Sequence, residues 1–218
     1  MQAIIKELGG RPDAAIIWLH GLGDEGASFV STIPYLKLPT ALQVRFVFPS
    51  APVRAVTVNN GMQMRSWYDI KAMLPQRVID ADQLDESVKS IEALVSEQIA
   101  AGIAPERIIV VGFSQGGALC YELGLKGVVK VGAIAAMSTY MPRMLEEKQC
   151  KADRSLSILT IHGDRDDVVP YALGQSAVTQ LQKLGFSASW HSFPMAHEVS
   201  LESLTILGEW ITNNLTSN

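Results

Sequence analysis

A serine flanked by two glycines is the residue in this chain best placed to act as a nucleophile. Ser114 lies in Gly112-Phe113-Ser114-Gln115-Gly116, after the β-branched run at 108–111 and before small and apolar residues that favour a helix. A strand that turns sharply into a helix strains the residue at its apex and leaves room only for very small residues two positions before and after it. The turn also leaves the backbone N–H of Gln115 at the helix start, free to donate. The motif thus predicts a nucleophile and half of an oxyanion hole.

Three histidines follow Ser114, and chain order separates them as candidate bases. A serine hydroxyl needs a base to remove its proton and an acid to orient that base, and in folds with this turn the acid precedes the histidine in the chain. His162 closes a predicted strand before the aspartate cluster, and His191 lies inside another. His197 follows the Phe193-Pro194 break, at the strand edge where sites of open α/β sheets gather. We therefore expect His197 to be the base.

Three aspartates compete for the role of the acid. Asp164, Asp166 and Asp167 all lie just past the carboxyl end of the predicted strand at 156–162. Their adjacency does not choose between them, because a turn and a helix cap also use aspartate at such positions. The residues alone leave the acid open among the three.

A glycine-rich loop follows the apolar run at 14–20. Its sequence, Gly21-Leu22-Gly23-Asp24-Glu25-Gly26, matches the dinucleotide-binding fingerprint, which needs an acidic residue about 20 positions later. Residues 27–64 contain no Asp or Glu, and Pro34 is expected to end a helix that starts near Glu25 after about two turns. We therefore expect no nicotinamide cofactor. The alternative function of this loop is to present the N–H of Leu22 as the second oxyanion donor.

The segment from Pro49 to Pro75 has no long periodic pattern, which is typical of a binding loop. It contains a predicted hairpin with an Asn60-Gly61 turn, followed by aromatic and methionine residues. These favour an apolar wall for a chain-like ligand, and a small satellite core is the equal alternative. We assign substrate contacts to Met64, Trp67 and Leu74. Apolar residues between 29 and 36 are a further candidate wall, with core packing again the alternative.

Hydrophobic periodicity places this site on alternating strands and helices. The expected strands are 14–20, 44–48, 108–111, 130–137, 156–162 and 186–193, and the expected helices are 82–101, 115–125, 171–184 and 201–214. This alternation predicts a mostly parallel, doubly wound sheet. No internal repeat or linker interrupts it, so residues 1–218 are expected to form one domain.

Composition narrows the possible partners. The chain has 218 residues, of which 48% are hydrophobic and 18% charged, and its net charge of -4 comes with scattered Lys and Arg. This argues against nucleic acid as a partner. Apolar runs are shorter than the roughly 18 residues that span a bilayer, and the amino end lacks a signal-peptide pattern. Cys120 and Cys150 are not spaced as in a metal site or a redox pair, so we expect no metal and two free thiols. Free thiols are typical of a reducing compartment, and we therefore predict a cytoplasmic protein.

Taken together, the motifs resemble the acyl-protein thioesterase and small carboxylesterase family of α/β hydrolases, nearly over the whole chain. The matching segments are 20–24, 51–57, 66–70, 112–117 and the His162-Gly163-x-x-Asp166 motif. The resemblance implies the α/β-hydrolase fold, with helices on both faces of the sheet. It also implies Asp166 as the acid beside Ser114 and His197, the Leu22 and Gln115 amides as the oxyanion hole, and Trp67 at the acyl site. Relatives often have glycine where this chain has Ala196, a small change that leaves the role of His197 intact.

The predicted function is hydrolysis of acyl esters or thioesters through a Ser-His-Asp triad, without a cofactor. The family's substrates include short carboxylesters, lysophospholipids and S-acylated proteins, so acyl length and ester type stay open, as does a homodimer. Two alternatives remain. One is a non-catalytic ligand-binding protein of the same fold, and the other is a lactone or peptide hydrolase that uses the same triad.

Overall fold

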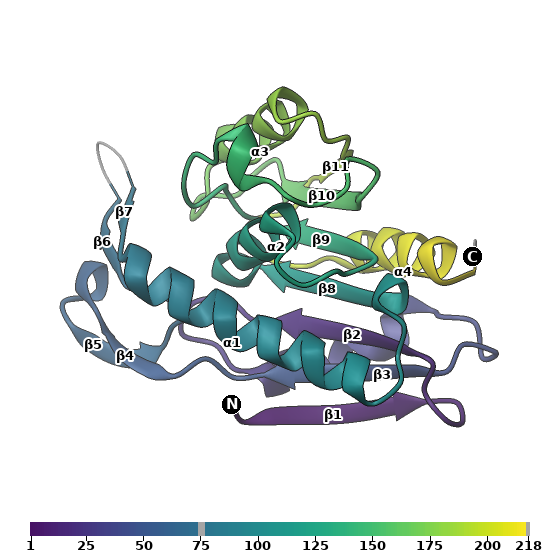
Figure 1. Ribbon diagram of the computed structural model, residues 1–218. Helices are drawn as coiled ribbons and strands as arrows, with labels where there is room; N and C mark the ends of the chain where they lie inside the picture. Colours follow the sequence, from purple (N-terminus) through teal and green to yellow (C-terminus); the bar gives the residue numbers. More distant parts are fainter. Residues whose placement is uncertain (74–76, 217–218) are drawn as a thin grey trace.

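A seven-stranded sheet forms the centre of the computed structural model, which describes residues 1–73 and 77–216 (Figure 1). The strand order is β1-β3-β2-β8-β9-β10-β11, and only β1 runs antiparallel to its neighbour. The strands are β1 (Ala3–Leu8), β2 (Ala14–Leu19), β3 (Val44–Pro49), β8 (Ile108–Phe113), β9 (Ala133–Met137), β10 (Ser157–Gly163) and β11 (Ser189–Phe193). The prediction of a mostly parallel sheet is confirmed.

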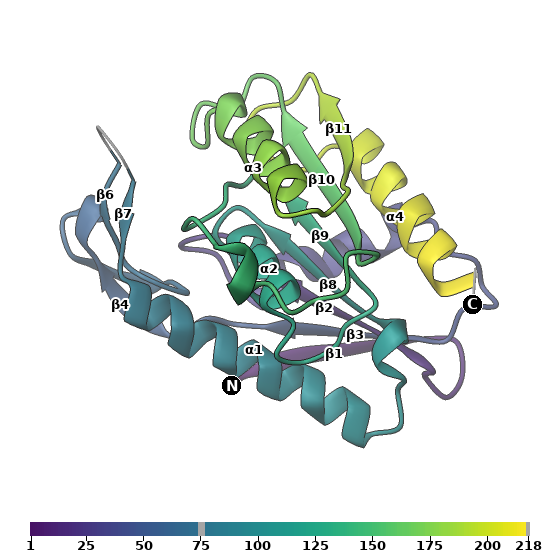
Figure 2. The ribbon, with the colours of Figure 1, turned by 45° about the horizontal axis from the view of Figure 1, so that its top comes forward.

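Helices cover both faces of this sheet (Figures 1 and 2). One face carries α1 (Ala81–Ala100), α2 (Gln115–Lys126) and α3 (Tyr171–Lys183), and the other carries the 3-10 helix η1 (Gly26–Leu36) and α4 (Leu201–Thr216). Residues of β2 alternate between the two cores: Ile17 packs on the α1 side and Ile16 on the α4 side. A central strand that is covered on both faces has an uninterrupted apolar sequence, and the run at 14–20 predicts a strand for this reason.

Helix α1 begins where an aspartate caps it. The carboxylate of Asp80 accepts a 3.0 Å hydrogen bond from the Gln83 N–H, a typical N-cap contact. In the sequence of α1, apolar residues recur on one stripe from Leu84 to Ile99. The stripe is buried from Leu84 to Val95, whereas Ile99 is 36% exposed in the last turn. The stripe therefore ends about one turn earlier than its sequence pattern indicates.

Three elements depart from the expected pattern. Strand β1 has a half-exposed burial pattern and pairs only with β3, so it gives no clear periodic signal. Helix η1 is a 3-10 helix that contains Pro34 and ends at Leu36, beyond the expected break. The hairpin of β4 (Val53–Val56) and β5 (Met62–Arg65) is joined by residues 57–61, including η2 (Thr57–Asn59), rather than by a two-residue turn. Asn60 and Gly61 both take positive φ, 55° and 73°, as an Asn-Gly turn requires.

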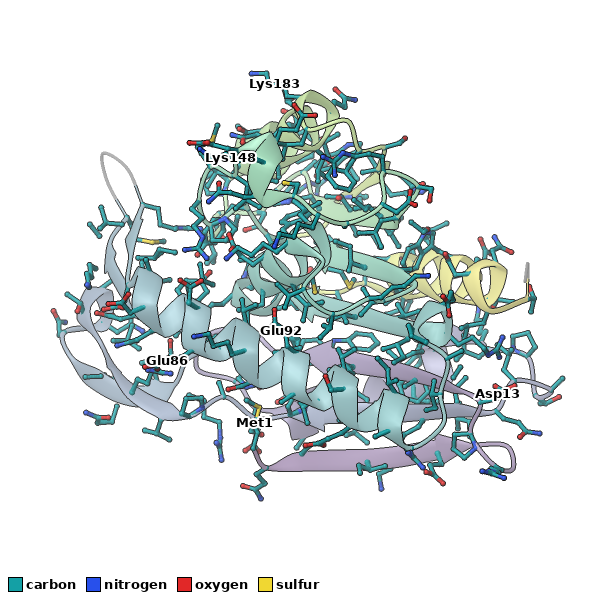
Figure 3. The ribbon with its side chains drawn as sticks, in the orientation of Figure 1. Met1, Asp13, Glu86, Glu92, Lys148 and Lys183 are labelled. Atoms are coloured by element: carbon teal, nitrogen blue, oxygen red, sulfur yellow. The ribbon has the colours of Figure 1, made fainter. Side chains whose placement is uncertain are left out.

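Smaller elements complete the described chain. Strands β6 (Ile70–Ala72) and β7 (Val78–Ile79) form a second, unpredicted hairpin, and η3 and η4 are single turns at Pro105–Arg107 and Glu147–Gln149. Labelled charged side chains such as Glu86, Lys148 and Lys183 lie exposed on the outside of the molecule (Figure 3). Within 1–73 and 77–216, the longest apolar stretch of any helix is too short to cross a membrane.

Candidate active site

Ser114 occupies the strained turn between β8 and α2. Its backbone angles are φ 53° and ψ -119°, a region that non-glycine residues rarely adopt. Its N–H donates to the Met137 carbonyl at 2.8 Å, and its own carbonyl accepts from the Thr139 hydroxyl at 2.6 Å. A Cβ at Gly112 would lie 2.3 Å from the Gly116 carbonyl oxygen, and one at Gly116 would lie 2.4 Å from the Leu19 carbonyl oxygen. Both glycines are therefore required by space, as their spacing predicts.

A histidine and an aspartate stand in line with this serine. His197 Nε2 is 2.9 Å from Ser114 Oγ, and His197 Nδ1 is 2.8 Å from Asp166 Oδ2. The buried Asp166 accepts the Val168 and Val169 N–H groups at Oδ1, so its Oδ2 is left for the imidazole. A carboxylate at Nδ1 places the ring proton there and leaves Nε2 free to accept the serine proton.

The other candidates lie away from this line. Asp164 and Asp167 are exposed, and His191 lies on β11. His162 is buried beneath Asp166, with its Nε2 2.9 Å from the Val169 carbonyl oxygen and 3.5 Å from Asp166 Oδ2. Burial lowers the pKa of His162, so it is neutral at pH 7. The structure thus brings together the three residues that the sequence and the resemblance singled out.

Two residues from different elements line the cavity beside Ser114 and carry backbone N–H groups without an acceptor in residues 1–73 and 77–216. Gln115 is the first residue of α2, so its N–H has no acceptor within the helix. Leu22 lines the same cavity as Ser114, and its N–H has no acceptor among the described residues. Two such donors beside a nucleophile are what an oxyanion hole requires.

A buried histidine sets the orientation of the Leu22 amide. His20 Nδ1 lies 2.6 Å from the Gly21 carbonyl oxygen, and its Nε2 accepts the Ala51 N–H at 2.9 Å. The Ala51 contact leaves the ring proton on Nδ1, which donates to Gly21, and burial lowers the pKa of His20 in agreement with a neutral ring. In a trans peptide the carbonyl and the N–H point in opposite directions, so the Leu22 N–H points away from His20. We did not foresee this contact, although His20 directly precedes the glycine loop.

The predicted substrate residue Trp67 has a different position. Its side chain is completely buried, and its Nε1–H donates to the His20 carbonyl at 2.9 Å. Its backbone N–H donates to the Gln115 side-chain oxygen at 2.8 Å, and the amide nitrogen of Gln115 donates to the Tyr68 carbonyl at 2.6 Å. Trp67 is therefore not among the residues that line the cavity, contrary to the prediction, because tertiary packing covers the whole indole and ties it to His20, the residue before the glycine loop.

A cavity of about 400 Å³ opens over Ser114 and His197. Its apolar walls are Leu22, Val58, Ile70, Met73, Val168 and Val169. The predicted Met64 is not among its lining residues; its sulfur accepts a hydrogen bond at 3.3 Å from Nδ2 of Asn59, which does line the cavity. Leu74 lies outside the described residues. Of the apolar residues between 29 and 36, Phe29 and Leu36 belong to the core on the α4 face, which favours the packing alternative.

Sequence reasoning missed several of these wall residues. Ile70 and Arg77 come from the β6–β7 hairpin, which gave no strand signal, and Val168 and Val169 come from the loop after β10. The one signal in the sequence was their position: Ile70 ends the segment 66–70 and Val168 and Val169 follow the His162-Gly163-x-x-Asp166 motif. Met73, by contrast, is one of the methionines of the predicted apolar wall, and it lines the cavity. Within the described part of the chain, no group of three or more His, Cys, Asp and Glu side chains is arranged to hold a metal ion.

Known proteins resemble this chain in both sequence and structure over most of its length. Residues 1–215 match the model of a family described as phospholipase/carboxylesterase. The acyl-protein thioesterase 1 homolog 1 of Dictyostelium discoideum is 33% identical over 205 residues, which cover 93% of this chain and 91% of the relative. The crystal structure of Arabidopsis thaliana SOBER1 superposes with a TM-score of 0.85 at 31% identity, over 93% of this chain and 99% of that one. The Zea mays acyl-protein thioesterase 2 structure gives a TM-score of 0.84 at 26% identity, over 98% and 99%.

Proposed function

This chain belongs to the phospholipase/carboxylesterase family of α/β hydrolases, and from that membership we propose that it hydrolyses acyl esters or thioesters at Ser114. The observation that carries the proposal is the line of contacts from Asp166 through His197 to Ser114, at 2.8 and 2.9 Å, beneath an apolar cavity. A pocket that only bound a ligand would need no such line.

The proposed reaction follows the order of these contacts. Ser114 Oγ attacks the substrate carbonyl carbon while His197 Nε2 takes its proton, and Asp166 stabilises the resulting imidazolium. The Leu22 and Gln115 N–H groups stabilise the oxyanion, each by about 3 kcal/mol if typical. His197 then protonates the departing alcohol or thiol, which leaves an acyl group on Ser114. Water, deprotonated by His197, releases the carboxylic acid and restores the serine.

The substrate class is proposed more coarsely than the reaction. The apolar walls favour an acyl chain over a peptide, and the relatives named as acyl-protein thioesterases and carboxylesterases support both thioesters and oxygen esters. An S-acylated protein or a lysophospholipid fits this class. We also propose a cytoplasmic location, supported by the free thiols of Cys120 and Cys150, and size-exclusion chromatography would test for a homodimer.

A fluorophosphonate is the direct test of an activated serine. Intact-mass analysis of the treated protein, followed by peptide mapping, is expected to show a single adduct on Ser114 and loss of aryl-ester hydrolysis. Ser114→Ala should fold normally, take up no label and lose turnover. A folded wild-type sample that neither reacts nor hydrolyses esters would favour the non-catalytic alternative, and an active Ser114→Ala variant would refute the assignment.

A further inference from the structure

An arginine without a carboxylate partner lines the cavity of the proposed active site. The guanidinium carbon of Arg77 lies 3.8 Å from the ring centroid of Tyr140, and both residues line the cavity that contains Ser114. The Nε and Nη1 atoms of Arg77 are buried and make no hydrogen bond to the described residues. Buried donors without acceptors are costly, and a bound anionic group would remove that cost.

Two carboxylates come into question as partners of Arg77, Asp24 on the cavity wall and Glu122 in the core near Tyr68, and both are engaged elsewhere. Glu122 is completely buried and pairs with Lys126 at 2.9 Å and Arg143 at 2.7 Å. Asp24 lines the same cavity and accepts hydrogen bonds from Ser28 and from the Glu25 N–H. Among the described residues, Arg77 has no carboxylate within ion-pair distance. Its charge is therefore available to a ligand, which Asp24 would repel from its own part of the wall.

A pair of tyrosines beside Arg77 offers a further donor. The hydroxyl oxygens of Tyr68 and Tyr140 are 2.7 Å apart, so one hydroxyl donates to the other. Only Tyr140 lines the cavity, and when the buried Tyr68 donates to it, the Tyr140 proton has no acceptor among the described residues. Burial raises the pKa of both phenols, which keeps both hydroxyls protonated at neutral pH. This group of side chains can therefore donate to a ligand but has little to accept with.

The apolar residues nearest to Arg77 in the chain indicate which part of a bound substrate would lie beside its guanidinium. Ile70 and Met73 belong to the same hairpin as Arg77 and line the cavity with it. An acyl chain that packs on these residues would bring its far end to the β6–β7 hairpin. We propose that the preferred acyl group ends in a carboxylate, which Arg77 binds while its guanidinium stacks on Tyr140. This inference rests on the proposed hydrolase function and names its substrate class more closely.

Matched acyl pairs test the inference. Hydrolysis of hexanoyl and adipoyl thioesters is compared, with the octanoyl and suberoyl pair as a repeat, because shorter carboxylated acyl groups cleave themselves by cyclisation. Wild-type protein is expected to prefer the carboxylated member of each pair in kcat/KM. Arg77→Met should lower the adipoyl-to-hexanoyl ratio by about 10- to 100-fold, and Arg77→Lys should restore part of it.

A control on the same hairpin separates local binding from net charge. Lys71 lies on β6, is half exposed and pairs with Asp80 at 2.9 Å, so Lys71→Met removes a positive charge outside the cavity and should leave the acyl ratio unchanged. Equal losses on both acyl groups in Arg77→Met would mean that Arg77 only packs, and would overturn the inference. The inference would also be overturned if Arg77→Met lowered turnover only for thioesters with an anionic leaving thiol, because Arg77 would then bind the leaving group and not the acyl group. Hexanoyl turnover that depends on Ser114 would keep the proposed function valid in either case.

Discussion

Asp166 differs from its neighbours Asp164 and Asp167 in burial and in the number of donors that hold it. Two backbone N–H groups bind its Oδ1 at 3.0 and 2.7 Å, whereas Asp164 and Asp167 are exposed. The backbone thus holds the carboxylate in place independently of its contact with His197. An orienting acid needs this fixation, because the imidazole follows the position of its partner.

Replacing Asp166 by Asn should reduce kcat/KM on a neutral aryl ester by about 10⁴-fold. The amide keeps the shape of the carboxylate, but its NH₂ group favours the tautomer in which His197 Nδ1 accepts, and Nε2 then carries a proton that blocks serine deprotonation. Asp164→Asn and Asp167→Asn should keep most of the activity, and circular dichroism would confirm that all three variants fold. Similar losses in the three variants would show that the acid is assigned wrongly.

At the scale of elements, α3 packs against β10, the strand that leads into the loop with Asp166. Gly174 of α3 faces His162 of β10 so closely that a Cβ there would lie 2.3 Å from His162 Nδ1. The imidazole has no room to retreat, since it is fully buried and its Nε2 contacts the Val169 carbonyl. The close approach of α3 keeps the loop after β10, and hence Asp166, next to His197.

Gly174→Ala should therefore destabilise the protein by about 2 kcal/mol, as overpacked cores usually do. Helix propensity alone predicts the opposite sign, because alanine in a helix is favoured over glycine by about 1 kcal/mol. Ser176→Ala, at an exposed position of the same helix, is the matched control and should be neutral or slightly stabilising. Urea unfolding of both variants measures the difference, and a stabilised Gly174→Ala variant would contradict the close contact.

At the scale of the whole molecule, two buried histidines link the site to global stability. Burial lowers the pKa of both His20 and His162, while in the unfolded chain a histidine titrates near 6.5. The unfolded state therefore binds more protons than the folded state below about pH 6.5. The two neutral histidines therefore contribute fully to the stability of the folded state above about pH 6.5. This contribution is lost as the pH falls through the lowered pKa values that the two histidines have in the folded state.

The free energy of unfolding should accordingly fall between about pH 6.5 and pH 5, before the carboxylates titrate. Urea unfolding at a series of pH values measures it, and one transition at each pH is expected if residues 1–218 form one domain, as we propose. His162→Asn should be less stable at pH 7 but show a shallower pH dependence, because one buried imidazole is gone. A flat or rising profile in the wild type would contradict the linkage.

Much of the fold was predictable because its signals are local. The apolar run of β2, the stripe of α1 and the Gly112-x-Ser114-x-Gly116 turn each depend on a few consecutive residues, and the structure has them within a few positions of the predicted bounds. Strand β1 is as long as β2, but it was missed because it is half exposed and pairs only at the edge of the sheet. The β6–β7 hairpin was missed because its strands are short and form a separate two-stranded sheet. Their patterns carry little periodicity, and only their partners stabilise them.

The sequence by itself determined the backbone of the site: a serine at positive φ between two indispensable glycines, and a glycine loop after the first central strand. These are requirements of local geometry, which a residue type meets or fails without reference to the rest of the chain. Tertiary structure alone decided which side chains reach the cavity. It buried Trp67, placed Arg77 on the ring of Tyr140, and positioned Asp166 rather than its neighbours beside His197. Such contacts join elements far apart in sequence, so their geometry is set by the packing of the whole sheet and its helices.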